Sequence, residues 1–260
     1  MWKRSAALAL LIAAWTTPAA AAQLEEILDR GQVSVGIALG GEPIGFRDGS
    51  NQPAGYDVDV ARRLAEELGV SLEIVEVTGA NRIPMLLSGQ IDVIIANITG
   101  TLERAKAIDF TLPYLRTGIK LLVQKESGIA GMGDLAGRRV VVGRGSTGEV
   151  LVKRLAPEAE LVYIDSYAPE GILLMRQGRA DAAVEDASLI DYTARQHPDR
   201  LVALPELYTS DAICIGVRKG EAAFLRWLDM FVSQYVSSGA YRDNYRKWWG
   251  AEPPPITPLW

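Results

Sequence analysis

Histidine and cysteine are nearly absent from this chain of 260 residues, which has one of each. A single cysteine allows no disulfide bond within the chain, and one histidine with one cysteine cannot build a soft-metal cluster. The same scarcity leaves no familiar nucleophile–base triad. His197 precedes a proline at an expected helix end, and Cys214 lies in the apolar stretch AICIGV. We interpret them as a solvent-facing loop residue and a small core residue.

An excess of basic charge is also lacking, because 27 lysines and arginines stand against 32 aspartates and glutamates, for a net charge of −5. Proteins that bind nucleic acid carry a basic patch, so no nucleic-acid partner is expected. Carboxylates are plentiful, but no paired motif singles out acid–base catalysis. With 48% apolar residues the composition is that of a globular protein. The length suffices for one large domain or two smaller lobes.

Long apolar runs are missing except near the N-terminus. Lys3 and Arg4 precede the apolar run AALALLIAAW, and Ala20–Ala22 offers a small-x-small cleavage site. The run is short for a membrane span, so we predict that residues 1–22 are a secretory signal peptide rather than a membrane anchor. No cysteine follows that could carry a lipid, and the pattern therefore favours a periplasmic protein over a lipid-anchored one.

From residue 33 onward, strand-like and helix-like segments alternate, which predicts an α/β fold with mostly parallel sheets. The pattern restarts near residue 118, which indicates two lobes. Strands are predicted at 33–38, 72–77, 91–96, 119–124, 139–142, 161–164, 180–184 and 212–217, and helices at 56–68, 81–88, 102–107, 148–155, 169–177, 187–196, 221–238 and 241–249. The proline-rich tail, residues 251–260, is predicted to be irregular.

The segment VVVGRGSTGEV contains the glycine spacing of a dinucleotide-binding fingerprint, G-x-G-x-x-G, at Gly143, Gly145 and Gly148. Asp165 even lies at the distance where that fingerprint has an acid. However, the small residue that usually follows the third glycine by four positions is replaced by Val152, which would hinder close helix–strand packing. We therefore expect this helix start to meet a different anion, and we interpret Asp165 as a strand-end or turn residue.

Three features of the sequence are suited to hold a small charged ligand. Arg104 lies in the first turn of a predicted helix, where amides and a guanidinium suit a carboxylate. Ser146 and Thr147 open another helix with hydroxyl and amide donors. Asp186 follows a strand, at the sheet edge where open α/β proteins bind ligands. Together they match an amino acid zwitterion, although each alone could be a surface arginine or a helix cap.

Several ordered motifs resemble the family 3 extracellular solute-binding proteins, the periplasmic amino-acid receptors of ABC transporters. The resemblance extends over about residues 33–250 and rests on PAGYDVDVARRLAEELGV, NRIPMLLSGQIDVIIANITGTLERAKAIDFTLPY, LAGRRVVVGRGSTGEV, GRADAAVEDAS, GVRKG and YRDNYRKWWG. It implies a two-lobed clamshell that closes on its ligand around two hinge crossings, near residues 116–120 and 210–216. The implied lobes are 24–115 with 216–250, and 120–210.

The resemblance also implies roles for single residues. Arg104 would hold the α-carboxylate of the ligand, aided by Thr99, while Asn97 lies on a ligand-facing turn whose main chain contributes. In the second lobe, Ser146 and Thr147 would donate to the ligand, and Asp186 would bind its α-ammonium group. No metal or cofactor is implied.

Two departures from the family pattern concern specificity. The opening loop, ALGGEPIGF, has Gly40 and Gly41 where an aromatic residue usually stacks on the ligand side chain. In related proteins with a segment like TGANRIP, the arginine often meets a side-chain carboxylate, and Arg82 occupies that position. We therefore expect the ligand to be an acidic or polar amino acid. The alternative is that Arg82 bonds a loop carbonyl or lies in solvent.

The resemblance favours a monomeric, non-enzymatic binding protein that delivers an amino acid to an ABC permease in the inner membrane. Two alternatives stay open. One is an enzyme on the same fold, similar to cyclohexadienyl or arogenate dehydratases, although the position near which such an enzyme needs an acid is Leu189. The other is a soluble sensor module that presents its ligand to a membrane kinase.

Overall fold

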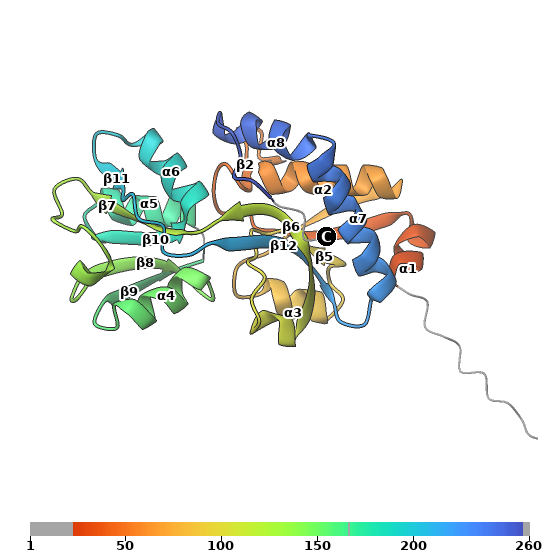
Figure 1. Cartoon of the computed structure of the whole chain (residues 1–260), viewed down its shortest axis with the longest axis horizontal. Helices are drawn as coiled ribbons and strands as arrows, with labels where there is room; N and C mark the ends of the chain where they lie inside the picture. The colour runs from red at the N-terminus through yellow and green to blue at the C-terminus, as the bar shows by residue number, and fades with distance from the viewer. Residues whose placement is uncertain (1–22, 166, 257–260) are drawn as a thin grey trace, which may run out of the picture.

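The computed structural model describes residues 23–165 and 167–256, in which two five-stranded sheets form the centres of two lobes (Figure 1). The predicted signal peptide and the last four residues of the tail lie outside the described residues. Residues 251–256 contain no helix or strand. No helix in the described part of the chain combines the length and apolar character needed to cross a membrane.

The first sheet has the strand order β4-β1-β5-β12-β6 and is surrounded by helices from both ends of the chain. Its lobe contains α1 (Gln23–Arg30), β1 (Gln32–Ile37), β2 (Phe46–Arg47), β3 (Pro53–Ala54), α2 (Tyr56–Leu68), β4 (Ser71–Glu76), α3 (Arg82–Leu87), β5 (Val93–Ile94), the 3₁₀ turn η1 (Arg104–Lys106), β6 (Ile108–Thr117), β12 (Asp211–Arg218), α7 (Ala222–Ser237) and α8 (Ala240–Trp249).

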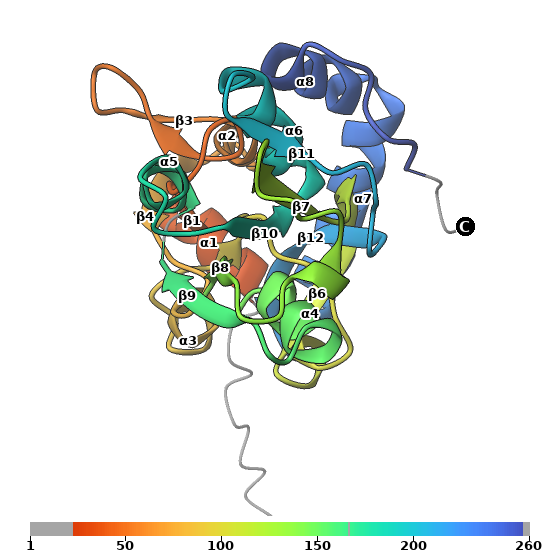
Figure 2. The same ribbon diagram turned by 90° about the vertical axis from the view of Figure 1, so that its left-hand side faces the viewer.

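The second sheet has the strand order β11-β7-β10-β8-β9, with α4 and α6 on opposite sides of it (Figures 1 and 2). Its lobe contains β7 (Ile119–Gln124), the 3₁₀ turn η2 (Met132–Asp134), β8 (Arg139–Gly143), α4 (Thr147–Leu155), β9 (Glu160–Ile164), the π-turn η3 (Tyr167–Gly171), α5 (Ile172–Arg176), β10 (Ala182–Asp186), α6 (Ala187–Gln196) and β11 (Leu201–Ala203).

The α/β class is confirmed, but the prediction of mostly parallel sheets is wrong. In each five-stranded sheet, two of the neighbouring strand pairs are parallel and two are antiparallel. The antiparallel pairs arise where the chain passes between the lobes, because β6 leads into β7 and β12 returns beside β6. Antiparallel neighbours need no helical crossover, so the alternation of strands and helices does not reveal them.

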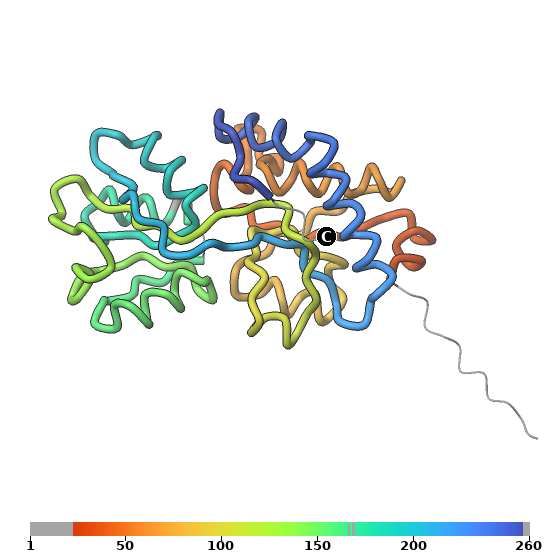
Figure 3. Tube along the Cα trace, in the orientation of Figure 1, coloured from red at the N-terminus to blue at the C-terminus, as the bar shows by residue number. Residues whose placement is uncertain are grey.

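Strands β6 and β12 connect the two lobes, and the tube in Figure 3 shows both running side by side from one lobe to the other. They pair antiparallel from Asp211 opposite Thr117 to Arg218 opposite Ile108, with irregularities beside Cys214. Cys214 is buried, as expected for a small core residue. These two strands occupy the region where hinge crossings were expected; the residue boundaries of the lobes remain predictions.

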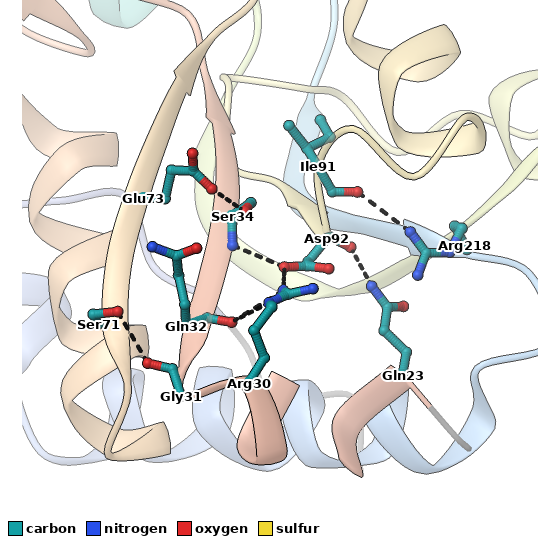
Figure 4. A network of polar contacts seen from close by, with 10 residues as sticks. All are labelled: Gln23, Arg30, Gly31, Gln32, Ser34, Ser71, Glu73, Ile91, Asp92 and Arg218. Atoms are coloured by element: carbon teal, nitrogen blue, oxygen red, sulfur yellow. Dashed lines mark hydrogen bonds and ion pairs between the residues drawn. The ribbon is translucent and has the colours of Figure 1, made fainter. Parts of the chain in front are cut away.

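A polar network fastens α1 to the start of β1 (Figure 4), and α1 lies on the side of the first lobe that faces away from the second lobe (Figure 1). The buried carboxylate of Asp92 accepts hydrogen bonds from Arg30 Nη2 at 2.5 Å and from the amide of Ser34 at 2.8 Å. The side chain of Gln23 donates to the Asp92 carbonyl at 2.8 Å. Each polar atom named here gains a partner on burial, which limits its desolvation cost.

Candidate functional site

A cavity of about 200 Å³ lies between the lobes, at the carboxyl ends of β1, β8 and β10. All seven residues predicted from the sequence line it: Arg82, Asn97, Thr99 and Arg104 from the first lobe, and Ser146, Thr147 and Asp186 from the second. The sheet edges therefore meet face to face, as open α/β sheets do at ligand sites. Further lining residues include Glu185, Tyr167 and Leu189.

Arg104 extends from the first lobe toward the helix-opening turn of the second. Its Nη1 donates to the carbonyl of Thr99 at 2.8 Å and its Nη2 to the carbonyl of Gly145 at 2.9 Å. The predicted helix around Arg104 is wrong, since only the three-residue 3₁₀ turn η1 forms there. The amide of Arg104 accordingly donates to Thr101 Oγ1. Burial lowers the pKa of the guanidinium, but the group stays cationic at neutral pH.

The turn at Asn97 is held in place by a buried carboxylate that the sequence did not single out. Asn97 has a left-handed backbone, with φ of 46°, and its amide donates to Asp57 Oδ2 at 2.8 Å. Asp57 is fully buried and also accepts from the Tyr114 hydroxyl at 2.8 Å. Thr99 follows on the same turn, and its main chain bridges to Ile213 of β12. This turn presents polar atoms to the cavity from a fixed position.

Asp186 ends β10 and directs its carboxylate across the gap between the lobes. Its Oδ2 accepts from Asn97 Nδ2 at 2.6 Å, while its buried Oδ1 has no hydrogen-bond partner among the described residues. It begins α6, yet its side chain forms no capping bond, contrary to the alternative role of a helix cap. Burial, together with the neighbouring carboxylate of Glu185, raises the pKa of Asp186 well above its usual range. A cationic group in the cavity would stabilise the ionised Asp186 against both its burial and the charge of Glu185.

The turn Gly143–Gly148 forms a strand–turn–helix, but its glycines serve packing and backbone geometry. Gly145 has φ of 73°, in the left-handed region. A Cβ on Gly148 would lie 3.1 Å from the carbonyl oxygen of Val184 in β10. The spacing that resembles a dinucleotide fingerprint thus reflects a tight turn and the approach of α4 to β10.

Ser146 caps α4, which is the role weighed as its alternative from sequence. Its Oγ accepts from the amide of Glu149 at 3.0 Å, and Glu149 Oε2 accepts from the amide of Gly145 at 2.7 Å. The amide of Ser146 donates to the Gly143 carbonyl at 3.1 Å. The amides of Thr147 and Gly148 also lie in the first turn of α4, where the helix itself supplies no partner for an N–H group.

Arg82 is buried at the start of α3, with only 7% of its surface exposed. Its Nη1 donates to the carbonyl of Ala96 at 2.6 Å, which matches the alternative of a bond to a loop carbonyl. The group nevertheless lines the cavity, and Nε has no partner among the described residues. Burial lowers the pKa of Arg82 to about 10, while the carboxylates of Glu185 and Asp186 oppose that shift. Arg82 is therefore a cation that carries a structural bond and faces two acids.

Glu185 is a second acid on the wall of the cavity, next to Asp186. Its Oε1 accepts from the Asp186 amide at 3.1 Å, and a Cβ on Gly143 would lie 3.6 Å from its Oε2. Burial raises the pKa of Glu185, and the charge of Arg82 opposes the rise. In the sequence Glu185 directly follows the predicted strand 180–184, and its position before Asp186 was the only available signal. The described residues contain no cluster of acids, histidine and cysteine placed to hold a metal.

The opening loop leaves the cavity without an aromatic wall at the expected place. Gly40 and Gly41 line the cavity, and Gly41 bridges to Gly45. A Cβ on Gly41 would lie 3.2 Å from Leu189 Cδ2, which belongs to the second lobe. The two lobes therefore approach closely here, and apolar contact at this edge comes from Leu189.

Comparison with known proteins gives consistent matches across the chain. Residues 33–251 match the bacterial extracellular solute-binding proteins, family 3. A glutamine-binding protein of Geobacillus stearothermophilus is 35% identical over 208 residues, which cover 78% of this chain and 79% of that protein.

Two solved structures show the same fold. A mutant of ArgBP from T. maritima gives a TM-score of 0.83 at 33% identity, covering 88% of this chain and all of that one (100%). The ancestral amino acid-binding protein AncCDT-1, a precursor of cyclohexadienyl dehydratase, gives 0.82 at 34% identity, covering 86% and 98%.

The family match covers most of the chain, and the similar structures are two-lobed amino-acid-binding proteins. The family acts outside the cytoplasm, and the relatives named here differ in the amino acid they bind. The order of motifs, the two sheets and the interlobe cavity agree with these matches. This chain belongs to the bacterial extracellular solute-binding proteins of family 3.

Proposed function

We propose that this protein captures a free α-amino acid with a polar side chain in the cavity between its lobes and delivers it to an ABC importer. The observation that carries the proposal is the pairing of Arg104 and Asp186 across one cavity, from opposite lobes. A guanidinium and a carboxylate placed in this way match the two charges that every α-amino acid carries. The family and its named relatives support an amino acid as the ligand.

Binding follows from the positions and contacts of Arg104 and Asp186. The α-carboxylate replaces the Gly145 carbonyl as the acceptor for Arg104 Nη2, and it also accepts from the amides of Thr147 and Gly148 at the start of α4. The α-ammonium donates to Asp186 Oδ1, which has no partner among the described residues. Since the ligand bonds groups of both lobes, it stabilises the closed arrangement and thereby shifts the population toward it.

The partners and location follow from the same proposal. Export through the signal peptide at residues 1–22 places the monomeric protein in the periplasm, where it meets the permease of the importer. A membrane partner of this kind can distinguish the closed, loaded form from the open one, because closure changes the relative position of the two lobe surfaces.

An enzyme on this fold is the second candidate, because AncCDT-1 is a precursor of a dehydratase and because Glu185 places an extra acid in the cavity. Leu189, near the position expected for the proton donor, is apolar. We expect no phenylpyruvate or phenylalanine to form on incubation with prephenate or arogenate. Product formation in proportion to protein concentration would favour the enzyme instead.

The proposal is tested by binding measurements on protein that has been unfolded and refolded to remove bound ligand. A thermal-shift screen of the twenty amino acids should show strong stabilisation by a small subset, since a ligand at 100 times its Kd adds about 2.7 kcal/mol to stability. Calorimetry then gives the Kd of each hit. A protein that responds to no amino acid would contradict the proposal.

Arg104→Ala is the matching variant. It should weaken the binding of the best ligand by about 3 kcal/mol, roughly a hundredfold in Kd, because it leaves the bound carboxylate without its cation. Arg138→Ala serves as the control, since Arg138 is exposed on the second lobe and does not line the cavity. Equal affinities for the two variants would show that the carboxylate binds elsewhere.

A further inference from the structure

Seven charged side chains of the described residues line the cavity. Glu76 pairs with Arg47 and Arg144 pairs with Asp165, and the proposed amino acid backbone uses two of the other four. Arg104 and Asp186 take the α-carboxylate and the α-ammonium, which leaves Arg82 of the first lobe and Glu185 of the second. These two form no ion pair with each other in the described structure, although both line the same cavity and lie near enough to influence each other's charge. A ligand side chain that enters the cavity therefore meets a cation on one lobe and an acid on the other.

The contacts of the two groups show what each can still offer. Arg82 donates from Nη1 to the carbonyl of Ala96, and its buried Nε has no partner among the described residues. Arg82 therefore still has N–H groups that can donate to a ligand. Glu185 accepts from the Asp186 amide through Oε1 and forms no ion pair with any described residue, so its carboxylate retains acceptor capacity. One side of the pocket thus donates and the other accepts.

Each class of side chain meets this pair differently. A carboxylate would pair with Arg82 but would face Glu185, a like charge. An ammonium or guanidinium group would pair with Glu185 but would face Arg82. An apolar chain would leave both charges desolvated without a partner. A carboxamide presents a carbonyl to Arg82 and an NH₂ group to Glu185, and it brings no net charge.

We propose that Glu185 determines specificity together with Arg82, and that the pair selects an amino acid with a neutral carboxamide or similar ureido side chain over the matching dicarboxylate. This inference rests on the proposed function and narrows its ligand class. It replaces the expectation drawn from Arg82 alone, which allowed an acidic ligand. Specificity arises from the repulsive partner as much as from the attractive one.

The proposal has a consequence for the dependence of binding on pH. Arg82, Arg104, Asp186 and Tyr167 line the same cavity as Glu185, and so do Glu76, Arg144 and Asp165, which are in ion pairs; the neighbouring Asp186 adds further negative charge. A bound dicarboxylate places a second negative charge beside Glu185, which favours the uptake of a proton by Glu185. The affinity for a dicarboxylate should therefore rise as pH falls, by at most about tenfold per pH unit for one proton. A carboxamide ligand takes up no proton, so its affinity should change little.

The test uses the near-isosteric probes L-glutamine and L-glutamate, with calorimetry at about pH 8 and about pH 6. The wild type should bind glutamine at least about tenfold more tightly than glutamate at the higher pH, and the preference should shrink at the lower pH. Glu185→Gln removes the repulsion without changing the size of the side chain. It should reduce the preference for glutamine by about tenfold or more and make glutamate binding nearly independent of pH.

Glu158→Gln is the matched control, because Glu158 is exposed on the same lobe and does not line the cavity. It should keep the wild-type preference and pH dependence. The inference is overturned if the wild type prefers glutamate at the higher pH, if its best ligand is basic or apolar, or if Glu185→Gln leaves the preference unchanged. In each of these cases the protein still binds an amino acid, so the proposed function survives; binding of no amino acid would overturn both.

Discussion

Asp57 illustrates, for a single residue, how a buried charge can hold a binding turn in shape. Its carboxylate accepts from the amide of Asn97, at a left-handed turn, and from the hydroxyl of Tyr114. Burial raises its pKa from 3.8 to about 7, although both hydrogen bonds and the charge of Arg82 act against the rise. The folded protein therefore binds this proton more tightly than the unfolded chain does. The resulting stabilisation is full below about pH 4 and is lost as pH rises through about 7.

Asp57→Asn should make the free energy of unfolding less dependent on pH. Between about pH 5 and pH 6.5 the wild type should lose about 1.4 kcal/mol per pH unit more than the variant, which carries no proton there. The asparagine keeps an oxygen for the Asn97 amide and an NH₂ group for Tyr114. Urea unfolding at several pH values measures this slope. The exposed variant Asp29→Asn should behave as the wild type, and a slope in Asp57→Asn equal to that of Asp29→Asn would refute the expectation.

The sequence predicted the motif residues that line the cavity better than it predicted the other buried acids of the site. Arg104 and Asp186 could be found because they stand in motifs shared with a family. Asp57 reads as an ordinary acid in the first turn of a helix, where the helix dipole favours one. Glu185 directly follows the predicted strand 180–184, where nothing in the sequence marks it as a site residue. Their burial depends on contacts with Tyr114 and with the opposite lobe, and such contacts between distant segments leave no local pattern.

Among the elements, the crossing from β6 to β7 is the most tightly packed at a glycine. Of all the described glycines, Gly118 is the one where an added Cβ would come nearest to another backbone atom. A Cβ on Gly118 would lie 2.0 Å from the carbonyl oxygen of Thr209, two residues before β12, the strand that returns to the first lobe. Ile119 donates its amide to Thr209 Oγ1 at 2.8 Å, and the Ala187 amide donates to the Gly118 carbonyl at 2.7 Å. The crossing segments are thus fixed to each other and to α6.

Gly118→Ala should lower the free energy of unfolding by about 2 kcal/mol or more, because backbone must move to admit the methyl group. Gly133→Ala is the control: nothing lies within 4 Å of its added Cβ, and its effect should stay within about 0.5 kcal/mol. Urea unfolding of both variants measures the difference. Equal stability of the two would mean that the crossing relaxes at no cost.

Elements with strong local signals were predicted well, and those defined by long-range pairing were not. Helix α2 begins and ends at the predicted residues, since its apolar face is regular and Gly69 ends it with a left-handed backbone, with φ of 70°. Strand β6, ten residues long, was missed because among the described strands it pairs with β12 alone, about a hundred residues further along the chain. The predicted helix at 102–107 shortened to η1, because the chain there turns into β6 rather than packing an apolar helix face.

At the level of the whole molecule, contacts between the lobes fall into two groups. Arg104 Nη2 with the Gly145 carbonyl, and Asn97 Nδ2 with Asp186, join the lobes across the cavity. The indole of Trp249, in α8, donates to the carbonyl of Ser188 in α6 at 3.0 Å. The amide of Ser188 also donates to Thr117 Oγ1, at the end of the crossing strand β6. The contact between Trp249 and Ser188 therefore lies beside the crossing strands. Rotation about those strands moves this contact little, whereas it separates the contacts across the cavity.

Trp249→Phe should therefore lower stability without changing ligand affinity. The phenyl ring can keep the stacking on Tyr245, whose ring centre lies 4.4 Å away, but it loses the bond between the lobes. We expect a loss of about 1 to 3 kcal/mol in the free energy of unfolding and a change in Kd of less than about twofold. Trp248→Phe is the control within one lobe, because that indole donates to Asp59 in α2. If Kd rises about tenfold in Trp249→Phe alone, a difference of about 1.4 kcal/mol, the bond forms only in the closed state and contributes to closure.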